Sequence, residues 1–232
     1  MKKKLLFSFL LLTGLSLSAE AEKVKKIVVE YTDSAKLLIA NRADVAKISF
    51  SGENAPDTKS FTVNGVTFKM INVRKGTFQM GATDEQESAN QDETPVHQVT
   101  LTHDYYMGQT EVTQALWKAV MGSDNNPSYF SGDSLPVEQV SYNDIVGDNG
   151  FLAKLKELTG TTFRLPTEAE WEFAARGGNH SNKTQYCGSA TIDDVAWYYL
   201  NCNNTTHAVA TKKANELDLY DMSGNVKEWC SD

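Results

Sequence analysis

The sequence has few cysteines, no excess of basic residues and no long apolar run after its first residues. Its 232 residues include 3 cysteines and carry 22 Lys and Arg against 30 Asp and Glu, which gives a net charge of −8. Without an excess of basic residues, no surface is expected to bind phosphate backbones, so we expect no nucleic-acid partner. The hydrophobic fraction of 41% is ordinary for a globular protein and allows a packed core.

The cysteines lie at 187, 202 and 230, and they form neither a Cys-x-x-Cys pair nor a cluster with histidine. A zinc site or a redox dithiol is therefore not indicated. In an oxidising compartment we expect one disulfide and one odd thiol. The sequence does not choose among the three pairings of Cys187, Cys202 and Cys230.

The first 21 residues have the three parts of a secretory signal peptide. Lysines at 2, 3 and 4 precede an apolar run from Leu5 to Leu17, and a small-residue site ends at Ala21. The run is shorter than the roughly 20 residues that span a bilayer, and no later segment is long enough either. We therefore expect cleavage after Ala21 and an exported protein, periplasmic or extracellular, with no membrane span.

The rest of the chain divides by its patterning into an appendage, a linker and a larger domain. Residues 22–50 alternate as short β-type runs, and residues 51–60 have the polar, turn-forming content of a linker. Residues 61–232 form the predicted domain. The β-type runs of the appendage are Ile27–Tyr31, Leu37–Ile39 and Val45–Phe50.

Local signals in the domain predict one hairpin and a few short helices. Apolar residues alternate on both sides of Asn64-Gly65, the typical centre of a tight hairpin, from Phe61 to Phe68. The predicted helices are Glu111–Met121 capped by Thr110, a short one starting at Ser141, Phe151–Leu158, and one from the capping box Thr167–Glu170 to about Arg176.

Two acidic segments invite a functional interpretation. Thr83–Thr94 is either a calcium loop or a solvated loop, and its spacing fits no EF-hand, so we favour the solvated loop. Glu168, Glu170 and Glu172 are better explained by helix capping, the helix dipole and a pair with Arg176 than by catalysis.

The segment from Leu219 to Cys230 offers more chemistry. Asp221 and Glu228 supply carboxylate oxygens, and the turn Ser223-Gly224-Asn225 between them can present backbone carbonyls. Such a set can form an oxygen cage for calcium, but a plain hydrogen-bonded turn has the same composition. Both interpretations stay open on spacing alone.

Five ordered motifs together closely resemble the formylglycine-generating enzyme (sulfatase-modifying factor) family. They are Gly76-Thr-Phe-Gln-Met-Gly81, Glu111-Val-Thr-Gln114, Pro136-Val-Glu-Gln-Val-Ser141, Phe163-Arg-Leu-Pro-Thr-Glu-Ala-Glu-Trp-Glu-Phe-Ala-Ala-Arg-Gly-Gly178 and Leu219-Tyr-Asp-Met-Ser-Gly-Asn-Val-Lys-Glu-Trp229. The resemblance implies an α+β fold, the family's variant of the C-type lectin fold with low regular secondary structure. It further implies a structural calcium ion on Asp221, Gly224, Val226 and Glu228.

The family's enzymes oxidise a cysteine of a sulfatase to formylglycine with oxygen and a copper ion held by two cysteines. Those cysteines follow the last motif in the family, so we expect this chain to lack them and, as given, to be inactive. Two positions depart from the pattern, since Lys227 replaces a common tryptophan and Asp218 a glycine. The implied partner is a sulfatase or another exported protein, and the alternative function is a non-catalytic lectin-like binding or cell-surface module.

Overall fold

The computed structural model describes residues 27–30, 36–39, 57–86 and 91–232, within two compact units, 1–55 and 56–232. In the first unit, β1 (Ile27–Glu30) and β2 (Lys36–Ile39) pair antiparallel, with Ile27 opposite Ile39. Two of the three predicted β-type runs are thereby confirmed. The third run and the predicted signal peptide lie outside the described residues.

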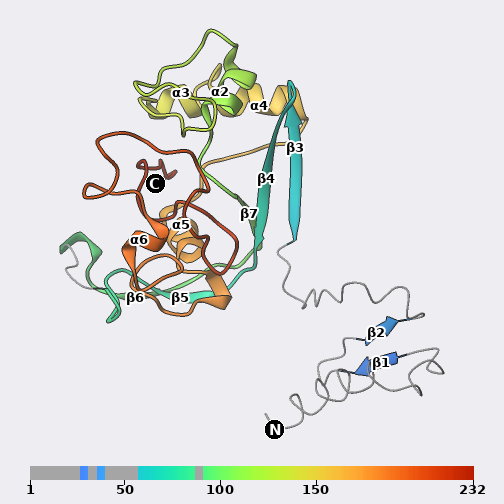
Figure 1. The fold of residues 1–232 in the computed structure, drawn as a ribbon, viewed down its shortest axis with the longest axis vertical. Helices are drawn as coiled ribbons and strands as arrows, with labels where there is room; N and C mark the ends of the chain where they lie inside the picture. Colours follow the sequence, from blue (N-terminus) through green and yellow to red (C-terminus); the bar gives the residue numbers. More distant parts are fainter. Residues whose placement is uncertain (1–26, 31–35, 40–56, 87–90) are drawn as a thin grey trace, which may run out of the picture. The chain divides into compact units, whose positions relative to one another are not determined.

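The second unit is built around a three-stranded antiparallel sheet in the order β3 (Thr58–Val63), β4 (Val66–Val73) and β7 (Tyr105–Gly108) (Figure 1). The predicted hairpin is confirmed, because Val63 pairs with Val66 across Asn64 and Gly65, whose φ angles are 46° and 84°. β5 (Thr77–Met80) and β6 (His97–Thr100) form a separate antiparallel pair.

The helices are short, and three of the four predicted ones begin where the sequence predicts. The predicted capping box forms at Thr167, and Ser141, predicted only as a helix start, forms a second one with Asp144. One boundary was wrong: Thr113, not Thr110, caps the first of these helices, and its hydroxyl accepts from Leu116 N, so Glu111 precedes the helix. The helical elements are η3 (Gln91–Glu93), α2 (Gln114–Met121), α3 (Tyr142–Val146), α4 (Phe151–Thr159), α5 (Glu168–Ala175), η4 (Gly178–His180) and α6 (Ile192–Val195).

Two hydrophobic clusters share the sheet. One packs Ile71 and Val73 of β4 against Phe173 of α5, and the other packs α2 against α4, with Trp117 stacked on Phe151 at 5.1 Å. Figure 1 shows α2, α3 and α4 gathered at one end of the sheet. In the described part of the chain, no helix has the length and apolar character needed to cross a membrane.

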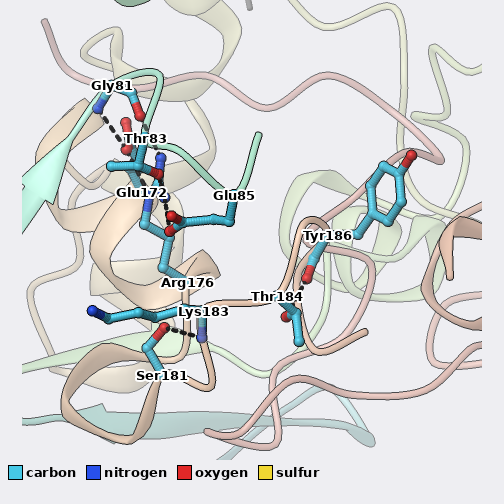
Figure 2. A network of polar contacts seen from close by, with 9 residues as sticks. All are labelled: Gly81, Thr83, Glu85, Glu172, Arg176, Ser181, Lys183, Thr184 and Tyr186. Carbon is cyan, nitrogen blue, oxygen red and sulfur yellow. Dashed lines mark hydrogen bonds and ion pairs between the residues drawn. The ribbon is translucent and has the colours of Figure 1, made fainter. Parts of the chain in front are cut away.

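Arg176, at the end of α5, fixes the segment that follows β5 (Figure 2). Its guanidinium donates to Glu172 at 2.8 Å, to Thr83 at 2.8 Å and to the Gly81 carbonyl at 2.6 Å. The predicted pair of Glu172 with Arg176 is confirmed. A further ion pair with Glu85 shows that the start of the predicted solvated loop is attached to the domain; residues 87–90 of that loop lie outside the described residues.

Candidate functional site: an acidic turn beside an aromatic groove

The segment from Asp221 to Glu228 contains a tight turn packed against Trp197. Gly224 lies beside Trp197 in a parallel bridge, and Asn225 N donates to the Trp197 carbonyl at 2.8 Å. Gly224 has a φ of +95°, and a Cβ there would come within 2.2 Å of the Trp197 carbonyl oxygen. Glycine is therefore required twice, for its backbone conformation and for this close approach.

Asp221 is 3% exposed, and its two oxygens have different surroundings. Oδ2 accepts from Ala210 N at 2.8 Å, whereas Oδ1 is buried and has no hydrogen-bond partner. Desolvation raises the pKa of this carboxyl group, because burial penalises the charged form. A buried carboxylate oxygen without a donor is costly, and a cation would satisfy it.

Glu228 follows the turn, and its carboxyl group faces the protein although the residue as a whole is exposed. The Trp171 indole N–H lies near this carboxyl group but is buried without a hydrogen bond of normal geometry. Desolvation, and in addition the negative charge of Asp221, raise the pKa of Glu228 to about 7.

Glu111 completes the acidic group, and sequence reasoning missed it by assigning it to a helix. Its side chain is buried, with Oε1 accepting from Val226 N at 3.1 Å and Oε2 from Asn225 Nδ2 at 2.7 Å. Desolvation, followed by the charges of Glu228 and Asp221, raises the pKa of Glu111 to about 9. Its place in the Glu111–Gln114 motif was the one sequence signal that it had a role outside helix formation.

The residues at the turn fit an oxygen-coordinated cation. Among the described residues, no three His, Cys, Asp or Glu side chains gather as a metal site, so a cation here needs backbone ligands. In that same part of the chain no N–H or O–H donates to the carbonyl of Gly224 or Val226. Free carbonyls, an unpartnered Asp221 oxygen and carboxylates that raise one another's pKa suit calcium. Asp221, Gly224, Val226 and Glu228 lie within one segment of eight residues, and calcium binding by them stays a prediction.

One side of this segment borders a groove of about 740 Å³. Phe61, Phe68 and Phe163 form an aromatic cluster in its wall, with ring centroids 5.2 to 5.9 Å apart. Trp229 is 47% exposed, and its indole donates to the Val140 carbonyl at 3.1 Å. We call this cavity the aromatic groove; it is also lined by Glu111, Val226, Lys227, Glu228, Lys59, Lys69 and Arg164.

The three cysteines are free thiols, so the expected disulfide was wrong. Cys187 is packed against the core cluster around α5 and its Sγ donates to the Met222 carbonyl at 3.1 Å. Cys202 lies in a turn, where its N–H donates to the Tyr198 carbonyl. Desolvation, and to a smaller extent the charge of Asp232, raise the pKa of the Cys230 thiol to about 11. Because the three thiols contact different parts of the domain, they do not fit the thiolate pair that holds copper in the family's enzymes.

The sequence matches the family described as sulfatase-modifying factor enzyme 1-like domain over residues 54–232. The chaperone protein LppX of Paenibacillus barcinonensis is 34% identical over 241 residues, covering 84% of this chain and 78% of LppX. The formylglycine-generating enzyme of Thermomonospora curvata is 32% identical over 136 residues, covering 52% of this chain and 40% of the enzyme. Treponema denticola variable protein 1 superposes with a TM-score of 0.62 at 34% identity, covering 76% of this chain and 77% of that protein. This superposition confirms the predicted α+β fold with little regular secondary structure.

Proposed function

Because the chain belongs to the sulfatase-modifying factor enzyme 1-like family, as its five motifs predict, we propose that it binds a polypeptide segment of an exported partner protein in the aromatic groove. The groove is the single observation that carries this function. Its phenylalanine cluster suits apolar side chains, and the exposed Lys227 suits a peptide carbonyl or an acidic side chain.

The surroundings of the groove support a polypeptide over a small polar ligand. Its volume of about 740 Å³ accommodates several side chains of an extended segment. Lys59, Lys69 and Lys227 line it in a chain of net charge −8, and these lysines favour a segment that carries acidic residues. Lys227 stands where the family's enzymes commonly have tryptophan, which supports binding without oxidation.

A peptide-binding measurement tests this proposal. The probe is a fluorescein-labelled peptide with apolar and acidic residues on both sides of a Cys-x-Pro-x-Arg core, and its binding to residues 22–232 is followed by fluorescence anisotropy. We expect saturable binding that weakens at least about tenfold in Trp229→Ala, because aromatic anchors dominate such contacts. Tyr199→Ala is the matched control, since Tyr199 is an 84% exposed aromatic residue that does not line the groove. Equal affinity in both variants, or no binding by the unaltered chain, contradicts the proposal.

Calcium on Asp221, Gly224, Val226 and Glu228 is a structural part of the same proposal. The ion would supply positive charge to a segment whose carboxylates otherwise repel one another. It would also hold one wall of the groove, because Val226 and Glu228 line the cavity. Calcium is therefore expected to tighten peptide binding, and chelation is expected to weaken it.

Oxidation of a partner's cysteine is the second candidate, favoured by the identity to formylglycine-generating enzymes. Residues 22–232 alone are expected to form no peptide aldehyde, because their three thiols do not fit a copper-binding pair. Mass spectrometry of the Cys-x-Pro-x-Arg peptide after incubation with copper and oxygen tests this. Detection of the aldehyde would establish the oxidase and overturn the binding-only function.

Export is tested by cell fractionation and by a mature N-terminus at Glu22.

A further inference from the structure

Glu111 is joined to the candidate calcium turn across a sequence separation of 114 residues. Within the described part of the chain, Glu111 and Asp221 are the buried carboxylic acids. Glu111 is not one of the four predicted ligands, and both of its oxygens are occupied by donors from the turn, Asn225 Nδ2 and Val226 N. A buried acid fully engaged by the backbone and side chain of a ligand turn has the arrangement of an outer-shell partner.

The turn is also held by hydrogen bonds to Trp197 and to His207, and both sets of bonds are made by Asn225. Asn225 N donates to the Trp197 carbonyl at 2.8 Å, and Asn225 Oδ1 accepts from His207 N at 3.0 Å. Asn225 Nδ2 is shared between Glu111 and the His207 carbonyl. Asn225 has a φ of +58°, so this conformation depends on such external contacts.

We infer that Glu111 is a positioning residue for calcium, orienting the backbone of the turn so that the Gly224 and Val226 carbonyls face the ion. The inference rests on the calcium binding proposed above and adds the residue that pre-orders its backbone ligands. The Val226 N–H bond to Glu111 fixes the plane of the peptide between Asn225 and Val226, which lies between the two peptides that carry the Gly224 and Val226 carbonyls. The bond from Asn225 N to Trp197 fixes the plane of the peptide that carries the Gly224 carbonyl, so Glu111 adds the restraint on the neighbouring peptide. A turn without these contacts would have to be ordered by calcium itself, which lowers affinity.

A carboxylate suits this role better than an amide. In the ionised form, which the charge of a bound calcium ion favours, Glu111 presents an acceptor to each of two donors, whereas glutamine of the same shape would present one acceptor and one donor. Glu111→Gln therefore loses one hydrogen bond and places two donors against each other, with almost no change in volume. Loss of an outer-shell partner of this kind typically lowers metal affinity by about 10- to 100-fold.

Calcium titration calorimetry of residues 22–232 tests the inference, on samples whose circular dichroism is native. We expect Glu111→Gln to weaken calcium binding by about 10- to 100-fold. Asn225→Gly removes the amide that donates to Glu111, and glycine tolerates the positive φ at this position. It should weaken binding similarly, and the double variant should add little, because the two residues act as one unit. This second variant keeps the test valid if Glu111→Gln folds poorly.

Gln114→Leu is the control for a general loss of stability. Gln114 is fully buried and holds the carbonyls of Phe130 and Pro136, with no hydrogen bond to the turn. This variant should unfold more easily yet bind calcium as the unaltered chain does. If the unaltered chain binds calcium and Glu111→Gln binds it equally tightly, the positioning role is overturned and calcium binding stands. If the unaltered chain binds no calcium, the calcium proposal fails and the positioning role fails with it.

Discussion

The close approach of Gly224 to Trp197 predicts a large effect of a single methyl group. In Gly224→Ala the new Cβ would lie 2.2 Å from the Trp197 carbonyl oxygen and 3.1 Å from its carbon, and these are backbone atoms that cannot rotate away. A φ of +95° adds strain of about 1–2 kcal/mol for any L-residue, and overpacking adds about 1–3 kcal/mol. We expect a loss of about 3 kcal/mol in the free energy of unfolding, a large share of a typical domain's stability.

Gly65→Ala is the matched control for this prediction. Gly65 has a φ of +84°, and a Cβ there would meet nothing within 4 Å, so alanine adds backbone strain without overlap. Urea unfolding followed by tryptophan fluorescence should show that Gly224→Ala loses at least about 1 kcal/mol more than Gly65→Ala. Equal losses in the two variants would refute the packing of the turn against Trp197.

Three other predictions concern pH, Arg176 and the thiols. Burial and two neighbouring acids raise the pKa of Glu111 from 4.5 to about 9, so without calcium the native state retains a proton that the unfolded state releases. The free energy of unfolding should therefore fall by about 1 kcal/mol per pH unit from about pH 5 to about pH 8. A rise in the urea midpoint over that range would contradict the raised pKa of Glu111. Arg176→Met should cost about 3 kcal/mol in the free energy of unfolding by leaving Glu172 and the Gly81 carbonyl unpaired. Arg164→Met is the control: it removes a guanidinium whose side chain is 59% exposed in its ion pair with Glu170, and it should cost less than about 1 kcal/mol in the same unfolding assay. A thiol reagent should titrate three thiols in unreduced, unfolded protein, and a single reactive thiol would instead reveal a disulfide. In the native state Cys187 should react slowest, because its Sγ is packed against the core cluster and donates to the Met222 carbonyl.

Local chemistry explains what the sequence alone could predict. The Asn64-Gly65 hairpin and the Thr167–Glu170 capping box depend on residues a few positions apart, and both form as expected. The segment Asp221–Glu228 was also recognisable, because its carboxylates and turn residues are close in sequence.

Contacts between distant segments explain what the sequence alone did not predict. Glu111 appeared to belong to a helix, since nothing near it indicates that its partners are Asn225 and Val226. Likewise, cysteine counting suggested a disulfide, but the fold places each thiol among different neighbours. Asp218 shows the reverse case, because its φ of +64° explains why relatives have glycine there, and its carboxylate accepts from Gln109 at 2.8 Å.

Calcium titration of residues 22–232 and of Glu228→Gln is the most direct test of calcium binding by the Asp221–Glu228 turn. Glu228 is exposed as a residue, so this substitution should preserve the fold while removing a charged ligand. We expect the unaltered chain to bind one calcium ion with a rise in melting temperature, and Glu228→Gln to lose most of both effects. Absence of calcium binding by the unaltered chain, or undiminished binding by Glu228→Gln, would contradict this expectation.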